Sequence, residues 1–187
     1  MKLLHLDSAI SGDASVSRRL TADIVSRLKV ADPTLDIIYR DLATDPLDHF
    51  TLAAAPSPDD PDSALAQFLA ADVVVIGAPM YNFAVPSQLK AWIDRILVAG
   101  STFRYGETGA VGLAGDTRVI VAVARGNRYA GDAPAAHQEH VETWLRTIFA
   151  FIGITAEFVI AEGMLLGPDV KETALAEART SIDALAA

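Results

Sequence analysis

Two aromatic residues, an asparagine and a methionine follow one of the most apolar segments of the chain. They occupy residues 80–83, directly after the run VVVI at 73–76 and the triplet GAP. Aromatic rings and a thioether pack well against a planar ring, and an amide side chain can hydrogen-bond its polar edge. The loop therefore suits the binding of a planar heteroaromatic group. On these residues alone it suits equally well an aromatic staple that holds the loop against the core.

A second candidate site is the small-residue loop SAISGDASVSRRL at 8–20. Ser15 and Ser17 fall in the first turn of a predicted helix, where hydroxyls and free backbone N–H groups can bind a single phosphate, and Arg18 and Arg19 add positive charge. Neither G-x-G-x-x-G nor G-x-x-x-x-G-K-[ST] occurs, so the dinucleotide fingerprint and the ATP-type P-loop are absent. The alternative is that Ser15 or Ser17 is only an N-cap.

Two further loops are longer than compact domains usually contain. The segment ARGNRYAGDAP at 124–134 has two glycines, Gly126 and Gly131, which permit close approach of the backbone to a ligand. The glycine-rich segment 99–116 contains Phe103 and Tyr105, which could reach over a ligand as a partial lid. An ordinary strand-to-helix connection is the alternative for the first segment, and a dimer contact is the alternative for the second.

Several other chemistries are disfavoured. The chain has no cysteine, which excludes disulfides, thiolate metal sites and cysteine nucleophiles. His137 and His140 lie three residues apart without a third ligand at a suitable spacing, so a solvated helix face is expected and no metal site. G-x-S-x-G, the nucleophile motif of many hydrolases, is also absent. A net charge of −9 argues against nucleic acid and anionic membrane surfaces as partners.

The whole chain reads as one domain, residues 1–187, with enough apolar residues (51%) for a sizeable core. No apolar stretch approaches the roughly 18 residues that cross a bilayer, and the start MKLLHLDS lacks a signal-peptide core. We therefore expect a cytoplasmic protein that does not interact with membranes. The Pro- and Asp-rich segment 51–64 is typical of a surface loop.

Hydrophobic periodicity predicts the elements that must position these loops. Strands are expected at 3–7, 35–42, 73–79, 118–124 and 155–162, and helices at 16–28, 63–71, 89–97, 141–152 and 175–185. Five strand–helix units in this order indicate a doubly wound parallel sheet. Such sheets bind ligands beyond the carboxyl ends of their strands, so the loops after the first, third and fourth strands should form one site.

The stretch PMYNFAVPSQLKAWIDRILVAGSTFRY at 79–105 resembles the FMN-dependent NADH-azoreductase family, relatives of the NAD(P)H:quinone reductases. The likeness begins at SVSRRLT, continues in RGN, FIGIT and AEG, and so covers nearly the whole chain. It implies an α/β fold of three layers, flavodoxin-like, with a five-stranded parallel sheet in the order 2-1-3-4-5 flanked by helices.

The resemblance also implies one FMN per subunit and the residues that would hold it. The phosphate would be bound at the start of the first helix by Ser15, Val16 and Ser17. The flavin ring would be lined by Pro79, Met80, Tyr81, Asn82 and Phe83, and its other edge closed by Arg125, Gly126 and Asn127. Phe103 and Tyr105 would flank the substrate space. The family works as homodimers with active sites near the subunit interface.

The chain departs from the family pattern in three places. Ala9 stands where the family commonly has a second serine in the first loop. Ala124 and Asn127 replace the outer residues of a frequent Ser-Arg-Gly-Gly, and the loop around 43–62 is short. Ala9 and Ala124 each remove a possible hydrogen bond to FMN, Asn127 brings a side chain close to the ring edge, and the short loop opens one side of the substrate pocket.

The implied activity is that of an FMN-dependent NADH oxidoreductase, a quinone reductase or azoreductase with a ping-pong cycle. NADH would deliver hydride to flavin N5, and a quinone or azo compound would then take two electrons from the reduced flavin, with no side chain acting as nucleophile or base. The alternatives are an NAD(P)H:flavin reductase and a flavodoxin-like electron carrier. Four arginines are candidate partners for the 2′-phosphate of NADPH: Arg18, Arg104, Arg125 and Arg128.

Overall fold

A five-stranded parallel sheet forms the centre of the molecule. The computed structural model describes residues 1–51, 58–60 and 62–186. The strands are β1 (Lys2–Asp7), β2 (Asp36–Asp41), β3 (Val73–Pro79), β6 (Arg118–Ala124) and β7 (Glu157–Ala161). They lie in the order β2-β1-β3-β6-β7 with every neighbouring pair parallel, which confirms the predicted flavodoxin-like topology.

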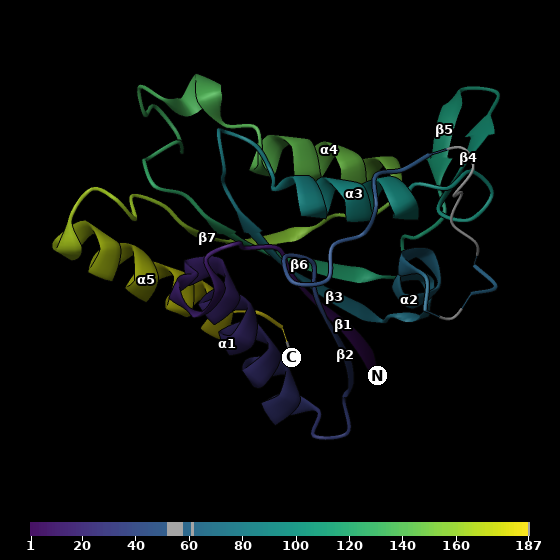
Figure 1. Cartoon of the computed structure of the whole chain (residues 1–187), viewed down its shortest axis with the longest axis horizontal. Coiled ribbons are helices and arrows are strands. Elements are labelled where there is room, and N and C mark those ends of the chain that lie inside the picture. Colours follow the sequence, from purple (N-terminus) through teal and green to yellow (C-terminus); the bar gives the residue numbers. More distant parts are fainter. Residues whose placement is uncertain (52–57, 61, 187) are drawn as a thin grey trace.

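Helices cover both faces of this sheet and complete the three layers (Figure 1). Helices α1 (Val16–Ala31) and α5 (Pro168–Asp183) pack on one face, while α2 (Ala64–Ala70), α3 (Ser87–Ile96) and α4 (Glu142–Phe151) lie on the other. Two single turns of 3₁₀ helix, η1 (Gly12–Ala14) and η3 (Ala136–Gln138), lie in the loops after β1 and β6.

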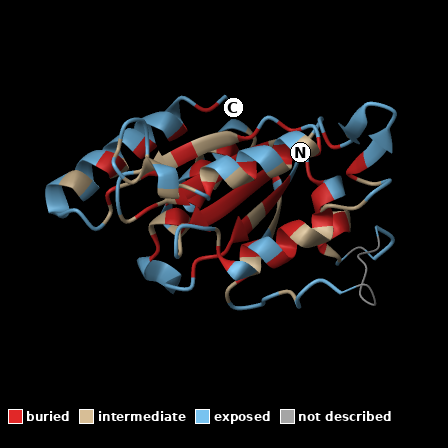
Figure 2. Cartoon of the chain, turned by 90° about the horizontal axis from the view of Figure 1, so that it is seen from above, coloured by how far each residue is buried: buried red, intermediate tan, exposed pale blue. Residues whose placement is uncertain are grey.

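The central strand explains why the sheet needs cover on both sides. All seven residues of β3 are buried, and Figure 2 shows the buried strands running beneath helices whose outer faces are exposed. Alternate β3 side chains join two separate hydrophobic clusters, because successive side chains of a strand point to opposite faces. Val74 and Ile76 contact the layer of α2, α3 and α4, whereas Val73 and Val75 contact the layer of α1 and α5.

The glycine-rich segment 99–116 contains an antiparallel hairpin, β4 (Phe103–Gly106) and β5 (Gly109–Gly112), where the sequence indicated only a long loop. Strands of four residues are too short to show a period, and Gly109 supplies the positive φ of the turn. The Phe103 ring packs 4.7 Å from the Phe151 ring at the end of α4. The Ala114 amide donates to the Ile152 carbonyl, so the hairpin lies at the end of the sheet where β6 begins.

The remaining predictions differ from the structure mainly at element boundaries. Helix α5 begins at Pro168, seven residues before the predicted 175, because its first turns are exposed and carry no apolar stripe. The predicted loop at 51–64 and the short stretch at 43–62 both include residues 52–57 and 61, which lie outside the described residues. Within the described part of the chain, no helix is both long and apolar enough to cross a membrane.

Candidate functional site

The loops after β1, β3 and β6 meet at the carboxyl edge of the sheet. The Ile10 amide donates to the Tyr81 hydroxyl at 3.1 Å, which joins the first loop to the second. The Met80 amide donates to the Ala124 carbonyl at 2.9 Å, which joins the second loop to the third. The structure thus brings together the predicted residues at 15–17, 79–83 and 125–127.

The first loop delivers the N-terminus of α1 to this edge. Ser15 is the N-cap: its hydroxyl accepts from the Arg18 amide at 3.3 Å and lies 3.1 Å from the hydroxyl of Ser17. Both serines are buried. No described residue accepts from the amides of Val16 and Ser17, so these two donors and the helix dipole face the site. Ser15 is therefore a cap, and the end that it caps remains suited to a phosphate.

Arg18 shapes this loop and is not free to meet an anion. Its guanidinium donates to the Asp41 carboxylate at 2.6 Å and to the Ala9 carbonyl at 2.8 Å. The hydrogen bond to Asp41 raises the pKa of Arg18 above its usual value. Arg18 therefore holds the Ala9 backbone in place, and the local positive charge expected from it is already paired.

The second loop contains a strained turn. Tyr81 and Ala84 exchange two backbone hydrogen bonds, of 3.0 and 3.1 Å, around Asn82 (φ 48°) and Phe83 (φ 71°). Positive φ at both central residues defines a type I′ turn, which accepts asparagine first but favours glycine second. Within the described chain, Asn82 and Phe83 are the only non-glycine residues with positive φ. A strain of about 1–3 kcal/mol of this kind tends to persist at functional positions.

The two aromatic residues of this turn differ in how far they are exposed to solvent. Tyr81 is half-buried and its hydroxyl is bonded to the first loop, as a staple would be. Phe83 is 46% exposed, so its ring contributes little to the core. Packing within one chain does not explain an exposed phenylalanine in a conformation that favours glycine. A flat ligand that covers the Phe83 ring would explain it.

Three carbonyls of the third loop bond to the segment 163–165. The carbonyls of Arg125, Gly126 and Asn127 accept from the amides of Met164, Leu165 and Gly163 at 2.9–3.1 Å. The Arg125 amide donates to the Ala161 carbonyl. No described residue accepts from the amides of Gly126 and Asn127. These two donors can meet negative charge on a ligand at this edge.

The Arg125 side chain points away from the predicted ring edge. It is 1% exposed and lies between Glu139, Glu142 and Glu162 at 3.2–3.7 Å. Arg125 can therefore meet a ligand only through its backbone. Sequence reasoning missed the three glutamates, because nothing in their local pattern shows that they share one arginine.

The structure does not bring Phe103 and Tyr105 to this edge within one chain. Both residues lie on β4, at the end of the sheet where β6 begins, whereas the three loops follow the strand ends at the opposite edge. Phe103 is buried against Phe151, and Tyr105 is 76% exposed.

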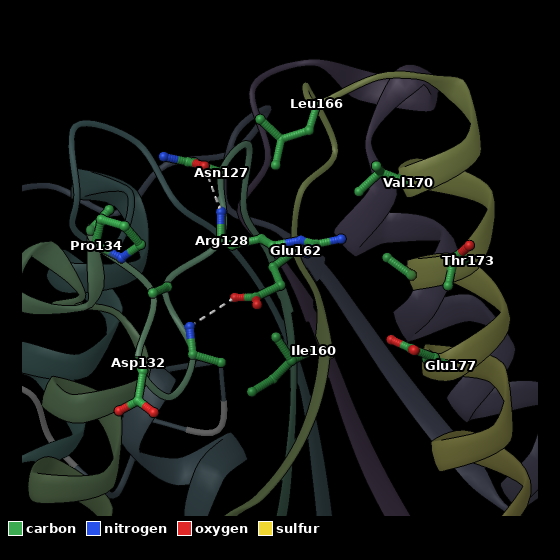
Figure 3. Close-up of a pocket in the computed structure, with 14 residues that line it drawn as sticks. Asn127, Arg128, Asp132, Pro134, Ile160, Glu162, Leu166, Val170, Thr173 and Glu177 are labelled. Carbon is green, nitrogen blue, oxygen red and sulfur yellow. Dashed lines mark hydrogen bonds between the residues drawn. The ribbon is translucent and has the colours of Figure 1, made fainter.

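Two hollows lie beside the loops. A cavity of about 790 Å³ is enclosed by the segment 127–135, the end of β7 and helix α5, and Figure 3 shows Glu162, Val170 and Glu177 around it. Asn127 is the only residue predicted for cofactor binding that lines this cavity, so it adjoins the third loop without being the ring site. A groove of about 600 Å³ runs between α3 and α4 and is lined by Val85, Lys90 and Trp144 among others. Among the described residues, no three His, Asp or Glu side chains are grouped to hold a metal ion.

Comparisons with known proteins agree with this architecture. The family described as having a flavodoxin-like fold matches residues 1–186. The FMN-dependent NADH:quinone oxidoreductase 2 of Bradyrhizobium diazoefficiens is 57% identical over 98% of this chain and all of its own length. The FMN-dependent NADH:quinone oxidoreductase of Methylorubrum populi is 57% identical over the full length of both chains.

Solved structures lead to the same group. An azoreductase from Bacillus anthracis str. Sterne matches with a TM-score of 0.86 and 28% identity, over 98% of this chain and 97% of that one. The FMN-dependent NADH-azoreductase of B. anthracis str. Ames Ancestor, solved in complex with FMN, matches with a TM-score of 0.84 and 26% identity, over 100% and 99% of the two chains. The chain therefore belongs to the flavodoxin-like family that contains the FMN-dependent NADH:quinone oxidoreductases and NADH-azoreductases.

Proposed function

We propose that the protein is an FMN-dependent NADH oxidoreductase that reduces quinones and azo compounds by two-electron transfer. One observation carries this proposal: the strained, exposed Phe83 turn lies at the same sheet edge as two pairs of unused amide donors. A flavin mononucleotide has a phosphate, a flat ring and a polar ring edge to satisfy these three features. The names of the relatives support the same cofactor and the same reductant.

Different residues of the chain would bind different parts of the cofactor. The amides of Val16 and Ser17 and the buried Ser17 hydroxyl would bind the phosphate. The segment 79–83 would line the ring, with Phe83 against its face. The amides of Gly126 and Asn127 would donate to its polar edge and stabilise the negative charge of the reduced state. When bound, FMN supplies the hydride-transfer chemistry, so no side chain needs to act as nucleophile or base.

We further propose that two copies of this single domain assemble through the α3–α4 face and act in the cytoplasm. The groove between α3 and α4 has an apolar lining that includes Trp144, and such a surface suits a partner of the same chemistry. Tyr105 lies at the wrong end of the sheet for its own flavin. It would instead cover the flavin of the partner subunit.

The reaction is tested with purified protein reconstituted with FMN. We expect anaerobic NADH to bleach the bound flavin within seconds, and a quinone or an azo dye to restore its absorbance. Steady-state rates with NADH and NADPH against each acceptor then define the preferred pair. Of the four candidate arginines, Arg128 is the one left beside its own chain's loops for a 2′-phosphate, because Arg18 is paired, Arg125 is buried and Arg104 lies on β4.

Two outcomes would favour the alternatives. Bound flavin that NADH does not reduce within seconds would indicate an electron carrier. Reduced flavin that separates from the protein on gel filtration would indicate a flavin reductase.

A further inference from the structure

The buried Arg125 and three partly exposed glutamates form an ion cluster behind the third loop. Its guanidinium lies 3.2 Å from Glu142, 3.4 Å from Glu139 and 3.7 Å from Glu162. Glu139 and Glu142 lie at the start of α4, and Glu162 directly follows β7. One arginine therefore ties the loop after β6 to the two elements that flank it.

Glu162 strengthens this attachment through the backbone. Its carboxylate accepts from the amides of Tyr129 and Ala130 at 2.9 and 3.2 Å. Together with the turn at 163–165, which occupies three carbonyls, it fixes one side of the loop. The amides of Gly126 and Asn127 are the donors left for the opposite side, because each N–H points away from the carbonyl of its own peptide group, which the turn binds.

The cluster also reaches the Phe83 turn. The Glu139 carboxylate caps α4 by accepting from the amides of Val141, Glu142 and Thr143 at 2.8–3.0 Å. Burial alone would raise the pKa of Glu139, but these hydrogen bonds outweigh it and hold the pKa below its usual value, so the group stays ionised. The next residue, His140, donates its amide to the Phe83 carbonyl at 3.2 Å. The start of α4 thus contacts both walls of the proposed ring site.

We propose that Arg125, with Glu139 and Glu162, is a positioning group that sets the spacing of the two loops around the flavin ring without touching the ring. The proposal rests on the proposed function. It differs from the family pattern as read from the sequence, in which Arg125 itself closes the ring edge. Replacing Arg125 would remove a buried, paired charge that contacts three glutamates and would strongly destabilise the fold, so the partly exposed Glu162 is the better residue to change.

The test compares Glu162→Ala with Glu157→Ala. Glu157 begins β7, at the opposite end of the strand from Glu162, pairs with Arg118 at 2.7 Å and is remote from the loops, so it controls for the loss of one acidic residue and one ion pair. Apo protein is titrated with FMN and with riboflavin, which lacks the phosphate. We expect Glu162→Ala to raise the dissociation constants of FMN and riboflavin by a similar factor, about tenfold. Glu162→Gln keeps an oxygen acceptor and should recover part of the affinity.

A second comparison separates this effect from the phosphate site. Ser17→Ala should weaken the binding of FMN but leave that of riboflavin unchanged, because Ser17 is proposed to contact the phosphate and not the ring. The positioning role is wrong if Glu162→Ala binds both flavins as tightly as Glu157→Ala does. It is also wrong if Glu162→Ala has a lower affinity for FMN alone. If Glu162→Ala does not fold, the same criteria apply to Glu162→Gln. Wild-type protein that binds no flavin would instead contradict the proposed function.

Discussion

At Phe83 the backbone adopts a conformation that costs free energy, and the ring gains little from the core in return. Two hydrogen bonds hold the turn in place. Tyr81 is bonded to the first loop, and His140 donates to the Phe83 carbonyl. Surrounding structure of this kind is what allows a strained residue to persist. Backbone strain at Phe83 lowers the stability of the apo protein. A ligand that covers the ring should offset this cost.

Phe83→Gly and Phe83→Ala separate strain from ring contact. Both variants lose the ring and should bind FMN about tenfold more weakly, since a stacked aromatic contributes about 1 kcal/mol or more. Only glycine relieves the positive φ, so Phe83→Gly should raise the free energy of unfolding of apo protein above that of Phe83→Ala by about 1 kcal/mol. Urea denaturation and flavin titration measure the two effects. Equal stability of the two variants would contradict the strain.

Residue types and spacing predicted which segments meet at the site but not how each side chain is used. Ser15–Ser17 and residues 79–83 follow strands whose ends share one edge, so strand order alone brings them together. Arg18 was expected to add positive charge near the ligand, and the resemblance implied that Arg125 closes the ring edge. Both are instead taken by carboxylates distant in sequence, Asp41 and Glu139 among them. Pairing of this kind depends on tertiary structure and leaves no local pattern.

At the scale of elements, the β4–β5 hairpin depends on a close backbone contact. A β-carbon at Gly112 would lie 2.2 Å from the Gly153 nitrogen, whereas one at Gly106 would have nothing nearer than 3.5 Å. The hairpin is therefore seated on the end of α4 at Gly112 and free of close contacts at Gly106. Its short strands escaped prediction, while the longer apolar strands of the sheet, such as 73–79, were predicted well.

Gly112→Ala should displace the hairpin and lower the free energy of unfolding by about 1–3 kcal/mol. Gly106→Ala, a change of the same size in the same hairpin, should have little effect. We also expect Gly112→Ala to lower quinone turnover while FMN affinity is kept, because Tyr105 moves with the hairpin and the flavin loops do not. Urea denaturation, flavin titration and steady-state rates test this. Similar behaviour of the two variants would show that the hairpin is not seated by Gly112.

At the scale of the whole molecule, Tyr105 lies at the end of the sheet opposite its own flavin loops, so its proposed place over a flavin needs the proposed second subunit. Co-expression of two differently tagged variants tests this. Ser17→Glu should not bind the FMN phosphate, and Tyr105→Ala should lack the cover of the substrate space. In a mixed dimer, the flavin of the Tyr105→Ala subunit would be covered by Tyr105 of the other subunit.

The co-expressed sample should therefore recover about a quarter of wild-type activity, since half the dimers are mixed and each has one complete site. Each variant alone should be far less active. If Tyr105 served its own chain, no mixed dimer would have a complete site and activity would not recover. A protein that remains monomeric on gel filtration would contradict the assembly itself.

The turn at 81–84 also has a consequence for how such chains diverge. Selection for stability alone favours glycine at position 83, and selection for flavin binding favours the aromatic ring. A descendant that no longer uses flavin is released from the second pressure and gains stability by a single substitution. Within the lineage, glycine at this position should therefore mark chains that have abandoned flavin, even where the rest of the fold has hardly changed.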